Sequence, residues 1–429
     1  MLMRALIHRR VAVVAQGIGD VLLIGSIQSA ATLRIKQFLA RNGHPFKYLD
    51  LDRDADVRDL LDRFRVDPAE IPVVICRGET VLKNPSNQEI ADCLGFNKRI
   101  DQTHLRDVVI VGAGPAGLAA AVCAASEGLD ALVIEASSPG GQAGSSSNIE
   151  NYLGFPTGIS GRELAGRAYV QAQKFGANVM IAKGATELTC ERKPFGVSLD
   201  GGATIGARTV IIATGARYRK PSLENLEPFE GAGIYYSATF MEAQLCLGDE
   251  VIVVGGANSA GQAAVFLART VKRVHLLVRS NNLSASMSRY LIRRIDETPA
   301  IQLRTGTEVV ALEGNGHLER VQWRDGTGAV SSHNIKHVFL MTGAEANTGW
   351  LNSRVTLDAK GFIKTGPDLK LEDLAAAQWP LQRSPYLLET ALPGVFAVGD
   401  VRCGNVKRVA SAVGEGSIAI SFVHRALAE

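Results

Sequence analysis

Three glycines in the first third of the chain have the spacing that binding of a dinucleotide pyrophosphate requires. Gly112, Gly114 and Gly117 follow a continuous apolar run, and so occupy the turn between a buried strand and a helix. The first glycine allows the tight turn, the second lets the backbone approach a pyrophosphate, and the third lets the helix pack closely on the strand. The pyrophosphate then lies against the positive N-terminus of the helix. Glu135 ends the next apolar strand, where an acid accepts hydrogen bonds from ribose hydroxyls.

A second, degenerate copy of this pattern lies in the middle of the chain. After the apolar residues 251–254, the fingerprint positions are Gly255, Ala257 and Ala260, so alanine replaces glycine twice. Considered alone, this copy is a weaker indication of nucleotide binding than the first. The small residues still permit close packing of a helix on a strand.

The end of the following strand distinguishes the second copy from the first. Arg279 and Ser280 stand where the first copy has an acid. A guanidinium pairs with a 2′-phosphate, which a carboxylate would repel, so we expect NADPH rather than NADH. The alternative is a surface arginine on a solvated turn, and Arg289 either assists or is irrelevant. The residues expected to bind NADPH are Gly256, Ala257, Asn258, Ser259, Ala260, Arg279, Ser280 and Arg289.

A third feature changes the assignment of the first. The apolar residues 392–398 end in Gly399 and Asp400. A carboxylate at the end of a strand, preceded by a residue without a side chain, can reach the ribityl hydroxyls of a flavin. The first fingerprint alone suggests a nicotinamide site, whereas with Asp400 it is expected to bind FAD.

Periodic apolar runs predict the elements that position these residues, and they indicate an α/β protein. A long glycine- and serine-rich loop, residues 136–155, follows Glu135, and loops of this length in a compact domain are usually functional. Strands are expected at 21–25, 46–51, 71–76, 80–82, 108–111, 209–213, 251–254, 274–278, 338–342 and 392–398. Helices are expected at 30–41, 56–65, 161–175 and 409–427, with a further helix opened by a capping box at Ser86.

Length and composition exclude several classes of protein. The chain has 429 residues, enough for about three domains, with 46% apolar and 21% charged residues. A formal charge of +3 is too small to indicate a nucleic-acid partner. No apolar segment reaches membrane length, and the six cysteines form no C-x-x-C and no zinc-like pairing. We therefore expect a non-secreted, cytoplasmic protein without a structural metal.

Two nested dinucleotide fingerprints and a returning Gly-Asp strand resemble the thioredoxin reductase branch of the flavoproteins that bind two dinucleotides. The resemblance covers about residues 107–429. It implies two Rossmann-like, three-layer ββα domains with the NADPH domain inserted in the FAD domain, and a homodimer. The implied FAD residues are Gly112, Gly114, Pro115, Ala116, Gly117, Glu135, Gly141, Gln142, Asn151, Ala185, Thr214, Gly399, Asp400, Arg408, Val409 and Ala410.

The resemblance also gives some of these residues a place around the flavin. Gln142, Asn151 and Ala410 would line the isoalloxazine, and Ala185 would touch the adenine side. The family has a glutamine at the position of Val409, so contact there is expected through the backbone only.

One departure from the family concerns its redox-active C-x-x-C. The cysteine positions, in the segment matching residues 233–240, are occupied by Ser237 and Phe240. Without a thiolate, nothing attacks the flavin or carries two electrons to a protein disulfide, so we expect thioredoxin reduction by the family mechanism to be absent. Cys246 and Cys403 are more typical of core or surface thiols than of substitutes.

The N-terminal residues resemble the glutaredoxin branch of the thioredoxin fold. Residues 29–32 match its C-x-x-C, so that Ser29 and Thr32 replace both thiols, and Ile71-Pro72 matches its cis-proline turn. A hydroxyl cannot form a disulfide, which excludes dithiol exchange here. We expect a domain kept for docking or packing, and the alternative is retained binding of a peptide or glutathione-like ligand. Loss of both dithiols as one event is a further hypothesis.

These observations predict the following domains: an N-terminal extension (1–20), a glutaredoxin-like domain (21–96), a linker (97–106), the first part of the FAD domain (107–217), the NADPH domain (218–345) and the second part of the FAD domain (346–429). The expected function is an NADPH-dependent flavoprotein oxidoreductase whose reduced flavin passes electrons to an external acceptor. A quinone, a ferredoxin or flavodoxin, a small disulfide and oxygen remain open, and ferredoxin reductases of this fold also lack the cysteines. The alternative is a non-catalytic flavin- and nucleotide-binding sensor or scaffold.

Overall fold

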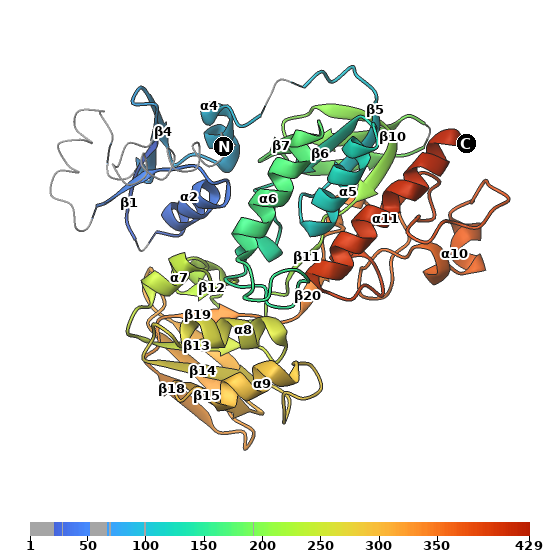
Figure 1. The fold of residues 1–429 in the computed structure, drawn as a ribbon. Coiled ribbons are helices and arrows are strands. Elements are labelled where there is room, and N and C mark those ends of the chain that lie inside the picture. Colours follow the sequence, from blue (N-terminus) through green and yellow to red (C-terminus); the bar gives the residue numbers. More distant parts are fainter. Residues whose placement is uncertain (1–20, 28, 52–66, 68–69, 98–99, 192) are drawn as a thin grey trace. The chain divides into compact units, whose positions relative to one another are not determined.

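The structure is a computed structural model that describes residues 21–27, 29–51, 67, 70–97, 100–191 and 193–429 (Figure 1). Contacts divide the chain into two units, each made of two segments. The flavin-type unit joins residues 87–217 to residues 344–429. The pyridine-type unit joins residues 1–86 to residues 218–343. We use these two names for the units that contain the first and the second fingerprint.

The flavin-type unit is organised on one seven-stranded sheet in the order β7-β6-β5-β10-β9-β8, with β21 also paired to β10. Its strands are β5 (Arg106–Val111), β6 (Ala131–Glu135), β7 (Asn178–Ile181), β8 (Ala185–Thr189), β9 (Phe195–Leu199), β10 (Thr204–Ile212) and β21 (Val395–Ala397). Its helices are α4 (Asn87–Leu94), α5 (Pro115–Ser126), α6 (Gly161–Lys174), α10 (Leu371–Ala376) and α11 (Val409–Ala428). Strand β5 pairs in parallel with β6 and with β10. The carboxyl ends of these three strands therefore lie at one edge of the sheet. The glycine turn follows β5 there, Glu135 ends β6, and Ala213 follows β10.

Helices α5 and α11 cross with almost no side chain between them. A Cβ added at Gly416 of α11 would lie 2.1 Å from the carbonyl oxygen of Ala116 in α5. The buried faces of both helices share one apolar cluster with Val108 and Phe396 of the sheet. The fingerprint helix is therefore held by strands on one side and by α11 on the other.

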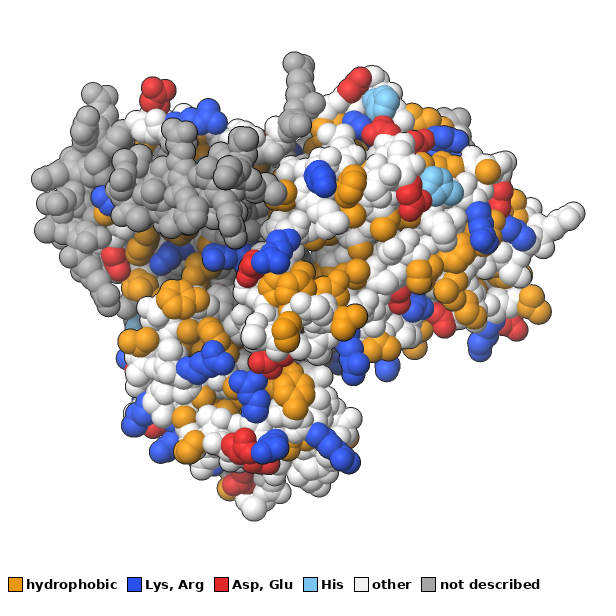
Figure 2. All heavy atoms as spheres, in the orientation of Figure 1, with side chains coloured by type: hydrophobic (Ala, Val, Ile, Leu, Met, Phe, Trp, Pro, Cys, Tyr) orange, Lys and Arg blue, Asp and Glu red, His pale blue; other side chains and the backbone are white. Residues whose placement is uncertain are grey.

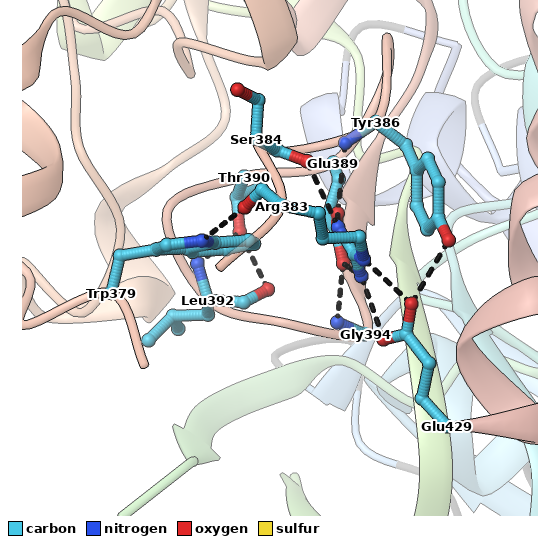
Figure 3. Close-up of polar contacts among 9 residues, drawn as sticks. All are labelled: Trp379, Arg383, Ser384, Tyr386, Glu389, Thr390, Leu392, Gly394 and Glu429. Atoms are coloured by element: carbon cyan, nitrogen blue, oxygen red, sulfur yellow. Dashed lines mark hydrogen bonds and ion pairs between the residues drawn. The ribbon is translucent and has the colours of Figure 1, made fainter. Parts of the chain in front are cut away.

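A buried ion pair anchors the last residue to the chain just before β21 (Figure 3). Glu389 is completely buried, and its carboxylate accepts hydrogen bonds from the Arg383 guanidinium at 2.7 and 3.2 Å and from the Gly394 amide at 2.9 Å. Arg383 also donates to the Glu429 carboxylate at 2.6 and 2.8 Å, and the Tyr386 hydroxyl donates to the same carboxylate at 2.9 Å. These hydrogen bonds to Glu429 hold the pKa of Arg383 above its usual value.

The described residues of the pyridine-type unit form three sheets. A parallel sheet has the order β12-β19-β13-β14-β15, and an antiparallel sheet has the order β16-β17-β18. Their strands are β12 (Ile234–Tyr235), β13 (Glu250–Val254), β14 (Arg273–Val278), β15 (Ile301–Thr305), β16 (Glu308–Glu313), β17 (Arg320–Arg324), β18 (Val330–His333) and β19 (Val338–Leu340). The helices are α7 (Phe240–Leu245), α8 (Asn258–Leu267) and α9 (Arg289–Asp296). The chain leaves and re-enters the flavin-type unit at β11 (Ala216–Tyr218) and β20 (Ala344–Ala346), which pair with each other.

The third sheet of this unit comes from the N-terminal residues and has the order β2-β1-β3-β4. Its elements are β1 (Val21–Gly25), α2 (Ala30–Arg41), β2 (Lys47–Asp50), β3 (Val73–Cys76) and β4 (Thr80–Lys83). The pairing of β1 is parallel with β2 and antiparallel with β3, and the Ile71-Pro72 peptide bond is cis. This order and the cis bond agree with a thioredoxin-type sheet, and the glutaredoxin-like assignment stays a prediction.

Two details of the expected organisation differ in the structure. Arg106, placed in the linker by its charge, is the first residue of β5 and is buried, because its guanidinium pairs with Asp130 at 2.8 Å. Helix α4 groups with the flavin-type unit, whereas residues 21–86 group with the pyridine-type unit. The expected helix at 56–65 and the extension 1–20 lie outside the described residues.

Figure 2 shows Lys and Arg side chains interspersed with Asp and Glu over the visible face. In the part of the chain that the structure describes, no helix is both long and apolar enough to cross a membrane.

Candidate functional site

The first glycine turn is built so closely that it excludes side chains at two of its three glycines. Gly112 has φ +107°, and a Cβ there would lie 2.3 Å from the carbonyl oxygen of Ala213. A Cβ at Gly117 would lie 1.9 Å from the carbonyl oxygen of Gly112. Helix α5 begins after Gly114 without a side-chain cap, so the amides of its first turn point outward as donors suited to an anion. This cradle fits a pyrophosphate.

Glu135 has a second role that the sequence did not indicate. Its carboxylate accepts hydrogen bonds from three backbone amides, those of Ala113 at 2.8 Å, Ser137 at 2.9 Å and Ser138 at 3.2 Å. The acid therefore holds the glycine turn, and its contact with a ribose stays a prediction. Its backbone carbonyl accepts a hydrogen bond from the Lys183 amide at 3.0 Å, which brings the chain before Ala185 to the same edge.

Two segments far away in the sequence meet the start of α5. In the glycine-rich loop, the Gly140 amide donates to the Ala113 carbonyl at 2.7 Å, and a Cβ added at Gly141 would lie 3.1 Å from Cα of Gly114. In the returning chain, a Cβ added at Gly399 would lie 2.9 Å from Cβ of Ala116. The fold thus brings together the fingerprint, Glu135, the loop and the Gly399-Asp400 turn.

The Gly399-Asp400 turn is held by a residue that sequence reasoning missed. Glu415 of α11 accepts hydrogen bonds from the Gly399 amide at 2.7 Å, from Arg402 at 2.7 Å and from Asn405 at 2.8 Å. Burial raises the pKa of Asp400, Lys407 lowers it and Glu415 raises it, with burial the largest cause. A carboxylate inside an otherwise small and apolar helix was the available signal for Glu415.

Thr214 and Gln142, two other residues expected to bind flavin, form hydrogen bonds to the backbone of the flavin-type unit. The Thr214 hydroxyl donates to the Asn347 carbonyl at 2.8 Å, and the Asn347 side-chain amide donates to the Thr214 carbonyl at 2.9 Å. The Gln142 side-chain amide donates to the Ala216 carbonyl at 2.5 Å. Their side chains therefore fix the loop and the strand end, and Asn347 is a second residue missed from sequence.

The structure does not bring the remaining expected flavin residues into the same hydrogen-bond network. Asn151 and Arg408 are exposed, and their side chains make no hydrogen bond to any described residue. Val409 and Ala410 begin α11. A cavity of about 480 Å³ between α5, α6 and α11 is lined by Pro115, Gly140 and Val409 but not by Glu135 or Asp400.

The second glycine turn tolerates its two alanines for a geometric reason. Gly255 keeps the strained position, with φ +143° and an added Cβ 2.5 Å from the Met341 carbonyl oxygen. Ala257 has φ −103°, which any residue adopts, and Ala260 is fully buried in the core. The degenerate fingerprint therefore retains the turn that the first fingerprint has.

Serine and asparagine side chains support this second turn. The Ser286 hydroxyl donates to the Gly256 carbonyl at 2.7 Å, and the Asn258 side-chain oxygen accepts from the Ser288 amide at 2.8 Å. The Ser288 contact places the start of α9, and with it Arg289, beside the start of α8. Arg279 and Arg289 are exposed and make no hydrogen bond or ion pair with the residues that the structure describes. Both guanidiniums are thus available to a phosphate, whereas the Ser280 hydroxyl donates to the Asn282 carbonyl at 2.7 Å.

The segment expected to have lost the redox cysteines has become an ordinary helix start. Thr239 caps α7 in a capping box with Glu242, between Ser237 and Phe240. Phe240 is 70% exposed, whereas Tyr235 is buried in the core. Cys246, at the end of α7, is completely buried, and burial raises its pKa to about 12.

The corresponding positions of the N-terminal domain are also structural. The Ser29 hydroxyl caps α2 by accepting from the Thr32 amide at 3.3 Å, and Thr32 is 1% exposed. None of the six cysteines, all of which lie among the described residues, is in a disulfide, and burial raises the pKa of Cys403 as well.

A family model described as pyridine nucleotide-disulphide oxidoreductase matches residues 106–416. The chain therefore belongs to this family of oxidoreductases. It is 33% identical over 320 residues to thioredoxin reductase of Ureaplasma parvum, covering 74% of this chain and 95% of the relative, and 31% identical over 331 residues to that of Bacillus subtilis, covering 77% and 97%.

Solved structures of thioredoxin reductases have a similar fold. Thioredoxin reductase of T. acidophilum superimposes with a TM-score of 0.66 at 28% identity, covering 76% of this chain and 99% of that one. The Lactococcus lactis enzyme gives 0.67 at 25% identity, covering 75% and 99%. The α/β fold with Rossmann-like sheets is confirmed. At the level of the family, the prediction of an NADPH-dependent flavoprotein oxidoreductase of thioredoxin reductase type is confirmed too.

Proposed function

We propose that the protein oxidises NADPH through a bound FAD and passes the electrons to an external acceptor without an internal disulfide. The flavin, when bound, supplies the chemistry by accepting a hydride and releasing electrons to the acceptor. The observation that carries the proposal is the absence of any C-x-x-C from the 429 residues, together with a fingerprint cradle that fits a dinucleotide. The relatives are named thioredoxin reductases, and this chain lacks the pair of thiols for that transfer.

The residues of the flavin-type unit hold and orient the cofactor in this proposal. The first-turn amides of α5 bind the pyrophosphate, Glu135 accepts from the ribose, and Asp400 faces the ribityl hydroxyls. The partly buried Asp400 is positioned through Glu415, which holds the Gly399 amide at 2.7 Å. In the pyridine-type unit, Arg279 and Arg289 bind the 2′-phosphate of NADPH.

The cysteines that remain do not replace the missing pair. A nucleophilic thiol must be deprotonated near neutral pH, and burial opposes this at Cys246 and Cys403. The proposal therefore assigns the electron exit to the flavin itself. A small molecule or a small redox protein can accept electrons there.

The deciding experiment is anaerobic mixing of the purified yellow protein with NADPH while the visible absorbance of the flavin is followed. Fast bleaching is expected, and an unchanged spectrum would instead support a sensor or scaffold. Addition of quinone, ferredoxin, a small disulfide or oxygen then identifies the acceptor. Turnover of oxidised thioredoxin at the rate of the small acceptors would contradict the proposal.

The loss of both dithiols as one event has its own test. Cysteines are restored at Ser29, Thr32, Ser237 and Phe240 together, and NADPH-dependent disulfide turnover is measured. The variant with alanine at all four positions is the matched control, since it alters packing without adding thiols. Turnover only in the cysteine variant is expected, and equal activity in both would count against the hypothesis.

A homodimer is implied by the resemblance, and apolar surface of the flavin-type unit supports it. Leu153 is 94% exposed, and Val170 of α6 and Ile418 of α11 are about half exposed. Light scattering of the purified protein tests the expected dimer.

A further inference from the structure

Helix α2 of the N-terminal domain packs on residues 231–246 of the same unit, and this contact has the character of a permanent interface. We propose that α2 is the resident occupant of this face and closes it to other proteins. The contact between α2 and this face does not depend on the proposed electron transfer. Its consequence for the acceptor rests on the proposed function, because the face contains the two positions where the family has its redox cysteines.

The centre of the contact is apolar. Leu33 of α2 is 6% exposed and belongs to one buried cluster with Tyr235, Ala238, Ala243 and Cys246. These four residues are each less than a tenth exposed. Removing a leucine from water stabilises the contact that covers it, and here that contact is shared between its own domain and this face.

A buried carboxylate gives the contact its polar anchor. Glu242 of α7 is completely buried. One of its oxygens accepts from the Thr239 amide at 2.7 Å and from the Thr239 hydroxyl, as part of the cap of α7. The other oxygen accepts from the Gln37 side-chain amide of α2 at 2.5 Å. A buried charge requires such partners, so α2 completes the solvation of Glu242.

A close backbone approach is the third observation. Gly231 has φ +78°, and a Cβ added there would lie 2.8 Å from Cβ and 3.1 Å from Cα of Ala30. Ala30 is the first residue of α2 and follows the cap Ser29. The end of α2 that carries one pair of replaced thiols therefore lies directly on the segment that carries the other pair.

The consequence concerns how electrons leave the protein. While α2 covers the part of this face around Tyr235, Ala238 and Ala243, a protein acceptor has no access to that part, whereas Phe240 at its edge is 70% exposed. An acceptor must then be small, or it must dock elsewhere. The N-terminal domain, which lacks a C-x-x-C pair, thus covers part of this face and carries no dithiol to it.

Charge reversal at the polar anchor tests whether the interface exists in solution. Q37E places a second carboxylate against buried Glu242, and hydrogen exchange is measured by mass spectrometry on the full-length flavoprotein. Exchange in residues 235–246 is expected to rise at least about tenfold, since like charges at this depth repel strongly. The double variant Q37E/E242Q is expected to restore protection, because the glutamine amide donates to the new carboxylate while its oxygen still accepts from Thr239.

Unchanged exchange in Q37E would overturn the proposal, and so would a double variant as open as the single one. Helical circular dichroism separates local opening from unfolding, since Glu and Gln have similar helix propensities. Neither measurement involves turnover. A protein that fails to oxidise NADPH but shows the rescue keeps this inference and loses the proposed function.

A glycine pair supplies a second, steric test. Gly231 and Gly248 both have φ +78°, but a Cβ at Gly248 meets no atom within 4 Å. G231A and G248A therefore carry the same backbone cost, and only G231A pushes against Ala30. Faster exchange of α2 in G231A than in G248A is expected, and equal exchange in the two variants would contradict the interface.

Discussion

The two glycine turns of this chain begin alike and are completed differently. Gly112 and Gly255 both have positive φ, and at both an added Cβ would strike the carbonyl oxygen of the residue that follows a neighbouring strand, Ala213 or Met341. The two turns differ at the third fingerprint position. An added Cβ at Gly117 would strike the backbone of the turn, whereas the position of Ala260 has room for a Cβ. The second copy therefore keeps the one glycine that its backbone requires.

The supports of the two turns differ in charge as well. Glu135 binds three amides of the first turn and its flank, and so places a negative charge beside the ribose position. The second turn is instead supported by two neutral side chains, Ser286 and Asn258. The exposed Arg279 follows the end of β14 in this unit. Under the proposed function, this difference in charge would suit the first turn to an unphosphorylated ribose and the second to a 2′-phosphate.

The largest expected effect comes from exchanging the third fingerprint residue in each turn. G117A puts a methyl group 1.9 Å from a backbone oxygen, which no rotamer change relieves, and overpacking of this kind costs about 1–3 kcal/mol or more. We expect purified G117A to lose its FAD and its yellow colour. A260G is expected to keep FAD and lose about 1 kcal/mol of stability through helix propensity. FAD content and urea unfolding measure both, and a fully flavinylated G117A would break the comparison.

A smaller loss is expected from neutralising the acid. E135Q keeps the shape but replaces one acceptor oxygen by a donor, and hydrogen bonds to charged groups contribute about 1.5–3 kcal/mol. FAD affinity is expected to fall by about 10- to 100-fold, measured by fluorescence titration of the apoprotein. The matched change in the other turn is S286A, which removes one neutral hydrogen bond and is expected to leave FAD affinity unchanged. Equal affinities of E135Q and the parent would show that Glu135 only braces the turn.

The nucleotide preference gives the third prediction. R279A is expected to raise KM for NADPH about tenfold or more, because a charge-assisted pair with the 2′-phosphate is lost, and to leave KM for NADH unchanged. Arg293 is also exposed, but it is paired with Glu297 at 2.7 Å, so R293A serves as the control. Parallel loss of both nucleotides in R279A would show that the arginine supports the fold and does not read the phosphate.

Much of this architecture was predictable, because its signals are local. The bounds of α2 at 30–41 follow from one amphipathic run with a serine cap, and helix 161–175 ends one residue early at Lys174. The strands that carry both fingerprints are continuous apolar runs and were found for the same reason. The prediction failed at Arg106, whose charge suggested a linker until its pairing with Asp130 was known.

The parts that escaped prediction are pairs of residues far apart in the sequence. Glu415 holding the Gly399 amide and Gln37 holding Glu242 depend on which helices lie side by side, and neither spacing nor composition encodes that. The roles of the cofactor residues themselves stay predictions, because they depend on contacts with a ligand and not on a local sequence signal.

The smallest expected effect is a difference in how the two units respond to acid. Burial lowers the pKa of His275 in the pyridine-type unit below its ordinary 6.5, although Glu250, at 3.0 Å, acts in the opposite direction. Hydrogen bonds from His275 and then Lys272 lower the pKa of Glu250 to about 2. Below pH 6.5 the unfolded chain therefore binds more protons than the folded one, first at His275 and then, below 4.5, at Glu250.

The contribution of His275 and Glu250 to the free energy of unfolding of the pyridine-type unit is thus expected to be fully present above pH 6.5. It should fall as the pH decreases, by at most about 1.4 kcal/mol per pH unit for one proton. Hydrogen exchange of β13 and β14 between about pH 7.5 and about pH 5.5, corrected for the intrinsic rate, measures this slope. H275Q removes the titrating ring but can still donate to Glu250, so its slope should be smaller. His424 of the flavin-type unit, paired with Glu127 at 2.9 Å on the surface, is the control. Suppose that H424Q reduces the pH dependence of exchange as much as H275Q does. The buried His275 is then not the cause of the acid sensitivity, and acid sensitivity does not distinguish the two units.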